Sequence, residues 1–356
     1  MADEEIKSNE QINEEEELKF PDDYYTYDKD DMRSLIQGFS QQILQAYRLG
    51  DKIEFKDPIN KIIVAGMGGS AIAGDLLKVY LHQFAQVPVI VNRGYILPEH
   101  ADKDTLVIVS SYSGNTEETV SAYKDANRRG CQIVSMVSGG RIYELSITNR
   151  TQVIKLPVGI QPRAALAYGF FPMLKIAEKA EILPDQKADV LRLAKNIDKQ
   201  AYRETGMALS EKLVGKIPLI YSSDLFEPVA YRWKTQINEN AKTMAFSNVF
   251  SELNHNELGA TKNAGKEGRF YCIILRSDME GHRIVKRMDI TKEHFKKADI
   301  DVTDLLIKGE NFLTKMFLGI HIGDWVSYYL ALRYKTDPTP VEEIETFKKE
   351  LGSYVL

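Results

Sequence analysis

Short apolar runs alternate with segments of helical periodicity along the first half of the chain. The runs typical of strands cover residues 61–66, 87–92, 104–111, 131–137 and 152–157. Apolar positions with helical spacing cover residues 71–84, 117–129 and 162–180, the last with Pro162 at its start, where proline is favoured. Strands that alternate with helices of this length indicate a parallel sheet with right-handed crossovers.

Predicted strands and helices also alternate in the second half of the chain. A polar helical segment at residues 187–206 leads to predicted strands at 216–223, 269–277 and 298–305 and to predicted helices at 227–241, 313–335 and 341–351. We therefore expect an α/β fold of two three-layer α/β/α sandwiches with mainly parallel sheets. The expected domains are residues 21–195 and 196–356, preceded by an acidic, flexible extension at residues 1–20.

Composition argues against several classes of function. The net charge is -5 with both signs spread along the chain, whereas a nucleic-acid binder would carry a basic stripe. The longest apolar segment, residues 312–332, is broken by His321 and Asp324, so no membrane span is expected. The two cysteines, Cys131 and Cys272, lie in apolar runs as small core residues, which favours a reducing compartment over a disulfide framework. The N-terminus lacks a signal-peptide pattern, and we expect a cytoplasmic protein.

A glycine-rich loop follows the first predicted strand, in the sequence VAGMGGSAIAGD. Gly66, Gly68 and Gly69 remove side chains so that backbone N–H groups can approach a ligand, and Ser70 opens the next helix. Helix N-termini carry unpaired N–H groups and a partial positive charge, which favour an anion.

A hydroxyl-rich loop follows the third predicted strand, in the sequence IVSSYSGNTEE. It offers the hydroxyls of Ser111, Ser113 and Thr116, and Thr116 is expected to be the N-cap of a helix that begins at Glu117. Both loops lie at carboxyl ends of strands, where open α/β sheets bind ligands. Together they predict a site for one compact phosphate.

Two alternatives remain open at this point. Glycine-rich turns and hydroxyl caps also occur without any ligand. A dinucleotide site is the other alternative, since Gly66, Gly68 and Ala71 match the pattern G-x-G-x-x-A. The acidic residue that would hold a ribose is missing after the second strand, where Asn92 and Arg93 stand instead. A loop so rich in hydroxyls suits a single phosphate better than a pyrophosphate.

The sequence S-Y-S-G-N-T-E-E after GMGGSAIAGD resembles the sugar isomerase (SIS) domain. That resemblance implies two SIS-type sandwiches and a serine/threonine loop that grips the phosphate of a phosphosugar. By this resemblance the phosphate-binding residues are Gly69, Ser70, Ser111, Ser113 and Thr116. SIS domains also occur in aminotransferases and in sugar-sensing repressors, so the loop alone does not define a reaction.

Three further stretches, PRAAL, NENAK and ELNHNE, resemble the bifunctional phosphoglucose/phosphomannose isomerases of the phosphoglucose isomerase superfamily, as does DPTPVEEIETFKK near the end. The likeness runs from about residue 61 through the C-terminus. It implies that Glu239 is the base, that Arg163 stabilises the enediolate, and that His255 and Lys348 assist ring opening. Lys349 is adjacent to Lys348 and remains an alternative for the lysine.

These residue types suit an aldose–ketose isomerisation. A carboxylate can move a proton between C1 and C2, a guanidinium can offset enediolate charge, and a histidine can move a proton during ring opening. No metal and no cofactor is expected, because the six histidines are scattered without metal-binding spacing.

The resemblance also implies a sugar-phosphate substrate and a homodimer in which the histidine comes from the neighbouring subunit. The expected activity is interconversion of glucose 6-phosphate, and of mannose 6-phosphate, with fructose 6-phosphate. The alternatives are a phosphosugar-sensing protein, which would need neither Glu239 nor His255, and another SIS isomerase. Glucosamine-phosphate synthase is one such enzyme, but it needs an amide-hydrolysing domain with an N-terminal cysteine nucleophile, which this sequence lacks.

Overall fold

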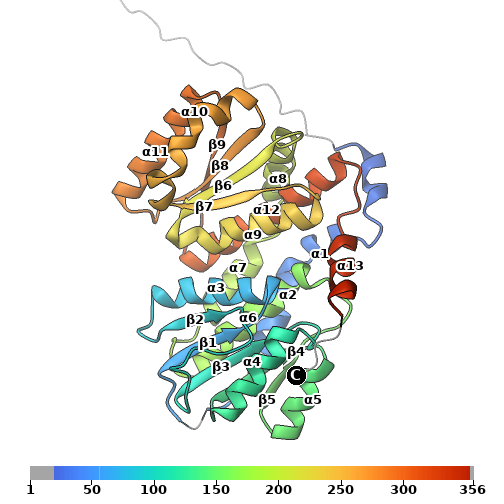
Figure 1. Ribbon diagram of the computed structural model, residues 1–356, viewed down its shortest axis with the longest axis vertical. Coiled ribbons are helices and arrows are strands. Elements are labelled where there is room, and N and C mark those ends of the chain that lie inside the picture. Colours follow the sequence, from blue (N-terminus) through green and yellow to red (C-terminus); the bar gives the residue numbers. More distant parts are fainter. Residues whose placement is uncertain (1–19, 56, 353–356) are drawn as a thin grey trace, which may run out of the picture.

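A computed structural model describes residues 20–55 and 57–352, and it contains two parallel β-sheets. The first lobe is built on the sheet of strands β1 to β5, and the second lobe is built on the sheet of strands β6 to β9. Figure 1 shows the two lobes stacked along the long axis of the molecule, with helices between the sheets. The acidic extension predicted for residues 1–20 lies, apart from Phe20, outside the described residues.

Five parallel strands form the first sheet. Their spatial order is β2 (Val89–Asn92), β1 (Lys61–Ala65), β3 (Thr105–Ser110), β4 (Gln132–Val137) and β5 (Gln152–Lys155). β1 and β3 pair in register from Lys61 with Thr105 to Ala65 with Val109. Because both strands end at the same edge of the sheet, the glycine-rich loop and the hydroxyl-rich loop lie side by side there.

Alternate residues of the first sheet point into two different cores. Ile62 and Val64 of β1 belong to a core with α3 and α6, whereas Ile63 and Ala65 belong to a core with α4 and α5. The helices of this lobe are α2 (Phe39–Arg48), α3 (Gly68–His82), α4 (Glu117–Arg128), α5 (Gly140–Asn149) and α6 (Leu166–Lys179). The result is the three-layer sandwich that the alternating pattern predicts.

Four parallel strands form the second sheet, in the order β7 (Phe246–Phe250), β6 (Ile217–Ser223), β8 (Phe270–Ser277) and β9 (Asp301–Ile307). One face packs against α11 (His282–Lys297) through Met288 and Phe295. The other face shares a core with α9 (Glu227–Asn240) and α12 (Phe312–Arg333). Short helices, among them α10 (Thr261–Ala264), connect β7 to β8, and α13 (Glu342–Leu351) follows α12.

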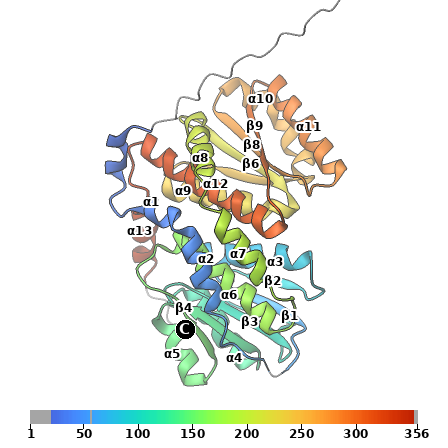
Figure 2. The ribbon, with the colours of Figure 1, turned by 180° about the vertical axis from the view of Figure 1, so that it is seen from behind.

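One continuous apolar core joins the two lobes, since it contains residues of α3 and α6 as well as residues of α9 and α12. Two helices, α7 (Lys187–Asn196) and α8 (Gln200–Lys212), connect the sheets, and α8 packs along α12 (Figure 2). The N-terminal segment also reaches the second lobe, because Phe20 and residues of α1 (Met32–Gln37) cluster with Trp325 and Tyr329 of α12.

The predicted fold class is confirmed, with local corrections. The helix predicted at 162–180 begins with a 3-10 turn, η2 (Pro162–Ala164), before α6 starts at Leu166. The helical segment predicted at 187–206 is divided into α7 and α8. Cys131 and Cys272 are buried and free, and no helix in the described part of the chain has the length and apolar character needed to cross a membrane. The domain boundary at residue 196 stays a prediction.

Candidate active site

The glycine-rich and hydroxyl-rich loops are in direct contact at the edge of the first sheet. A Cβ atom on Gly66 would lie 2.9 Å from the carbonyl oxygen of Ser110, so a larger residue would push the loops apart. Gly114, in the hydroxyl-rich loop, has φ +71°, and a Cβ there would lie 1.9 Å from the carbonyl oxygen of Gly139. Glycine is therefore required at Gly114 both for its backbone conformation and for the close approach.

The hydroxyl-rich loop leaves a helix N-terminus open. Ser111 Oγ donates to Thr116 Oγ1 at 3.1 Å, and the N–H of Gly114 donates to the Ser111 carbonyl at 3.0 Å. Thr116 is the N-cap of α4, as predicted, but its side chain accepts no hydrogen bond from that helix. The N-cap of α3, Met67, provides no side-chain bond either. Both helices thus present uncapped N–H groups, the arrangement that binds anions.

Gly69 links the glycine-rich loop to Arg163. A Cβ on Gly69 would lie 3.3 Å from the Pro162 carbonyl oxygen and 3.8 Å from the Arg163 Cα. The start of α3 therefore packs on the 3-10 turn η2, which carries Arg163. This contact places the expected phosphate loop beside a buried guanidinium.

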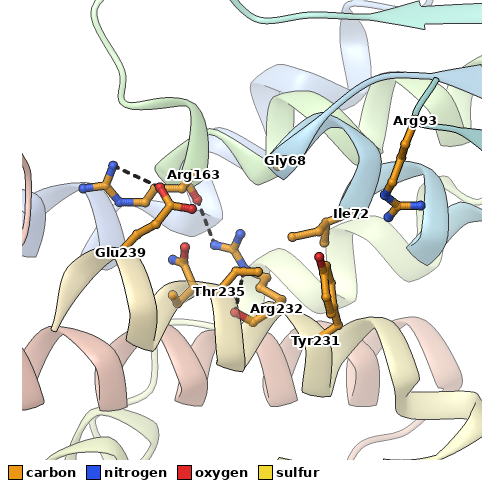
Figure 3. Close-up of a pocket in the computed structure, with 10 residues that line it drawn as sticks. Gly68, Ile72, Arg93, Arg163, Tyr231, Arg232, Thr235 and Glu239 are labelled. Atoms are coloured by element: carbon orange, nitrogen blue, oxygen red, sulfur yellow. Dashed lines mark hydrogen bonds and ion pairs between the residues drawn. The ribbon is translucent and has the colours of Figure 1, made fainter. Parts of the chain in front are cut away.

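The guanidinium of Arg163 makes three hydrogen bonds through Nε and Nη2, and its third nitrogen, Nη1, faces Glu239. Its Nε donates to Asn240 Oδ1 at 2.7 Å, and its Nη2 donates to the carbonyl oxygens of Pro338 at 2.7 Å and Thr339 at 2.5 Å. Nη1 lies 3.7 Å from Glu239 Oε2 (Figure 3). The side chain of Arg163 is 6% exposed and that of Glu239 is 32% exposed, so the carboxylate is the group that solvent and a ligand can reach.

Burial lowers the pKa of Arg163, and the charge of Glu239 opposes that shift. Lys242, on the same side of the site, has its pKa lowered by burial and then by the positive charge of Arg163. Its Nζ donates to the carbonyl oxygens of Glu239 at 2.5 Å and Pro340 at 2.6 Å. Two cations, Arg163 and Lys242, thus lie close to Glu239, and the charge of Asp337 also acts on both.

Arg163 and Glu239 line one pocket between the lobes. Its walls come from the start of α3, the segment after β2, the turn η2 and the helix α9, and they comprise Gly68, Gly69, Ile72, Arg93, Arg163, Tyr231, Arg232, Thr235, Gln236 and Glu239. Three arginines line the pocket, and each faces a carboxylate: Arg93 pairs with Asp75, Arg163 with Glu239 and Arg232 with Asp324. Figure 3 shows Arg163 and Glu239 at one end and Arg93 at the other.

The structure brings together only part of the expected residue set. Gly69, Arg163 and Glu239 line the pocket. The other expected residues are not among its lining residues, namely Ser70, Ser111, Ser113, Thr116, His255 and Lys348. His255 ends the 3-10 turn η4 (Glu252–His255) and is exposed, and Lys348 is exposed on α13, which buries none of its residues.

The loop that carries His255 is firmly attached. Asn254 Nδ2 donates to Thr291 Oγ1 of α11 at 2.8 Å. The Glu257 carboxylate accepts from Asn248 Nδ2 at 2.6 Å and from the hydroxyl of Tyr221. The side chain of His255 has no hydrogen-bond partner among the described residues and is exposed.

Sequence reasoning missed several residues that line the pocket. Arg232, Thr235 and Gln236 precede Glu239 by seven, four and three positions, so they lie on one side of α9 together with it. That spacing was visible in the predicted helix at 227–241 and could have found them. The sequence gave no indication that Arg93 lines the pocket, because a single arginine after a strand forms no recognisable motif.

Two parallel α/β/α sandwiches and a hydroxyl-rich loop beside a helix N-terminus define a SIS-domain phosphosugar protein. Residues 58–148 match the SIS domain family, and residues 203–351 match the family described as bacterial phospho-glucose isomerase C-terminal SIS domain. The tagatose-6-phosphate ketose/aldose isomerase of Escherichia coli has the same fold, with a TM-score of 0.66 and 13% identity over 88% of this chain and 94% of that chain.

Similarity to curated relatives is closer. The chain is 42% identical over 332 residues to the bifunctional phosphoglucose/phosphomannose isomerase of Caldicellulosiruptor bescii, covering 89% of this chain and 98% of the relative. It is 36% identical to the protein of the same name from Thermoplasma acidophilum, covering 90% of this chain and all (100%) of that relative. The chain belongs to the bifunctional phosphoglucose/phosphomannose isomerase family, which confirms the resemblance seen in the sequence.

Proposed function

We infer that this protein is an isomerase that interconverts glucose 6-phosphate and mannose 6-phosphate with fructose 6-phosphate. Membership of the bifunctional isomerase family over nearly the whole chain supports this activity. The observation that carries it is the position of Glu239 Oε2, 3.7 Å from Arg163 Nη1 in a pocket that begins at Gly68 and Gly69. A base and a fixed cation beside a phosphate loop are what an enediolate reaction requires.

In this proposal the substrate is anchored by its phosphate at the edge of the first sheet. Gly69 and Ser70 contribute the N-terminus of α3, and Ser111, Ser113 and Thr116 contribute hydroxyls near the N-terminus of α4. Neither helix has a side-chain cap that would compete with the phosphate. The phosphate contacts hold the sugar in the same way before and during the reaction, so they contribute to binding more than to turnover.

The proton transfer starts at Glu239. The carboxylate removes the proton from C2 of the open-chain aldose, the electrons move toward O1, and a cis-enediolate forms. Arg163 Nη1, the guanidinium nitrogen that faces Glu239, offsets the negative charge. The hydroxyl proton of O2 then passes to O1, Glu239 returns its proton to C1 as the C2=O2 double bond forms, and the ketose results. Since C2 of the enediolate is planar, addition of a proton to C2 from either face gives the glucose or the mannose epimer.

We propose that the working unit is a homodimer in which His255 enters the pocket of the other subunit. His255 is exposed, lies outside the pocket of its own chain and is carried by a firmly attached loop. The helix with Lys348 exposes Ile344, Phe347 and Leu351, an apolar stripe for a second copy to cover. His255 and Lys348 then assist ring opening.

The activity is tested by a coupled assay that starts from fructose 6-phosphate and scores glucose 6-phosphate and mannose 6-phosphate separately. Absence of both products refutes the proposed function. The shared site is tested by mixing a Glu239→Gln chain with a His255→Ala chain after mild dissociation. Mixed dimers contain one intact site, so activity above that of either variant alone is expected; no recovery at all contradicts the shared site.

The proposed location is the cytoplasm. Buried, free Cys131 and Cys272 are consistent with a reducing compartment, and a hexose phosphate substrate is an intracellular metabolite.

A further inference from the structure

A buried ion pair joins the wall of the pocket to α12. Arg232 of α9 is 2% exposed, and Asp324 of α12 is 6% exposed. Arg232 Nη2 lies 2.9 Å from Asp324 Oδ1 and 3.0 Å from Oδ2, so the carboxylate accepts on both oxygens. Gln236 Nε2 donates to the same Asp324 Oδ1 at 3.0 Å.

The same arginine holds the backbone of Arg163. Arg232 Nη2 donates to the carbonyl oxygen of Arg163 at 2.9 Å, and Figure 3 shows the guanidinium of Arg232 directed toward that carbonyl. The two arginines are 69 positions apart in the sequence and lie in different lobes. One guanidinium nitrogen thus connects the turn η2 of the first lobe to α12 of the second.

A second path joins the same elements. Asn240, which accepts from Arg163 Nε at 2.7 Å, donates through Nδ2 to Ser327 Oγ at 3.0 Å. Ser327 Oγ in turn donates to the carbonyl oxygen of Asp324 at 2.9 Å. Both the backbone and the side chain of Arg163 are therefore fixed to one turn of α12, through Arg232 and through Asn240.

A contribution to folding stability does not by itself explain why Arg232 and Asp324 are buried as an ion pair. Taking two charges out of water costs several kcal/mol per ion, and a buried ion pair is often no more stabilising than an apolar pair of the same volume. Arg232 Nε is also buried without a hydrogen-bond partner in the described residues, so the guanidinium is not fully compensated. What the arrangement does provide is a fixed position for Arg163 relative to Glu239, which lies seven residues after Arg232 on the same helix.

We propose that Arg232 and Asp324 are positioning residues for the isomerisation, which fix the Arg163 guanidinium against Glu239 across the boundary between the lobes. This inference rests on the proposed function. Neither residue transfers a proton. Loss of the pair lets η2 shift relative to α9, and a displacement of about 1 Å between reacting groups costs on the order of 100-fold in rate.

The experiment measures turnover of fructose 6-phosphate by Arg232→Gln and Arg232→Lys beside the wild-type protein. Arg129 supplies a matched control, since it also pairs with a buried carboxylate, Asp125, at 3.0 Å and donates to the backbone carbonyls of Leu97 and Pro98. Arg129 lies at the end of α4 away from the hydroxyl-rich loop. Arg129→Gln and Arg129→Lys therefore report the cost of losing a comparable pair where no chemistry is expected.

For Arg232→Gln we expect kcat to fall about 100-fold with KM within about threefold of the wild type, whereas Arg129→Gln keeps the wild-type kcat. Fructose 6-phosphate deuterated at C1 should give a larger isotope effect on kcat in Arg232→Gln, because proton transfer becomes slower than the other steps. A purely structural role would lower the melting temperature in both arginine variants and leave the isotope effect unchanged.

Three outcomes separate the possibilities. If the wild-type protein does not turn over fructose 6-phosphate, the proposed function fails. If the wild type is active and a folded Arg232→Gln matches Arg129→Gln in kcat and isotope effect, the positioning role is wrong while the function stands. If Arg232→Gln does not fold, Arg232→Lys, which keeps a charge opposite Asp324 but loses the planar fork, decides by the same comparison with Arg129→Lys.

Discussion

Replacement of Glu239 by glutamine tests the proposed chemistry most directly. The substitution keeps the size of the side chain and removes its capacity to accept a proton. A positioned general base contributes about 100-fold to 10,000-fold, which corresponds to about 3–5 kcal/mol of activation free energy. We expect kcat to fall by that factor while KM stays close to the wild-type value. The proposed phosphate contacts lie at the glycine-rich and hydroxyl-rich loops, and the substitution does not change them.

The structure separates this effect from a loss of stability. The Glu239–Arg163 ion pair is long, at 3.7 Å, and the glutamate side chain is 32% exposed, so the pair contributes about 1 kcal/mol or less to folding. Arg163 also keeps its bonds to Asn240, Pro338 and Thr339 in the variant. The melting temperature of Glu239→Gln should therefore change by only a few degrees.

Two controls accompany the assay. Glu239→Asp retains a carboxylate but shortens its reach by one methylene, and its kcat should lie between those of the wild type and Glu239→Gln. Glu227→Gln removes an exposed carboxylate from the first turn of the same helix and should leave kcat unchanged. Turnover by Glu239→Gln at the wild-type rate would show that another group carries the proton.

Further predictions concern binding, metal and pH. Ser113→Ala and Thr116→Ala should raise KM several-fold with little change in kcat, because phosphate contacts act equally in ground and transition states; a fall in kcat alone would contradict this role. Prolonged chelation should leave activity unchanged, since a base and a guanidinium supply the chemistry; activity restored only by added zinc would refute that view. Burial lowers the pKa of His321 to about 3, so below about pH 6.5 the unfolded chain binds a proton that the folded chain does not. The free energy of unfolding should then fall as pH drops from about 6.5, by about 2 kcal/mol at pH 5. Urea titrations of the wild type and His321→Asn at both pH values check this, and equal pH dependence in the two would be inconsistent with it.

The sequence predicted the parallel strands and most helices because their apolar runs are long and bounded by clear turns. It missed β7 and the helices α1, α2, α5, α10 and α11. β7 is an edge strand that fully buries only Phe250, and α11 is a mostly charged helix whose buried residues are Met288, Thr291 and Phe295. A short edge strand and a helix with a narrow apolar stripe give little local signal.

Site residues that belong to sequence motifs could be predicted. Contacts between segments far apart in the sequence could not. The resemblance identified Arg163 and Glu239, and the structure places them 3.7 Å apart. It gave no indication that Arg232 pairs with Asp324, 92 positions away, or that Arg163 contacts the backbone of Pro338. Such pairs depend on how the lobes dock, which the local periodicity of a single sequence does not contain.

The carbonyl oxygens that hold Arg163 belong to Pro338 and Thr339, 175 and 176 positions further along the chain. During synthesis the first lobe leaves the ribosome long before these residues are translated. The guanidinium consequently has no fixed orientation in a nascent chain, even when the first sheet has already folded. A chain that ends before residue 338 lacks both carbonyl oxygens that hold Arg163 Nη2.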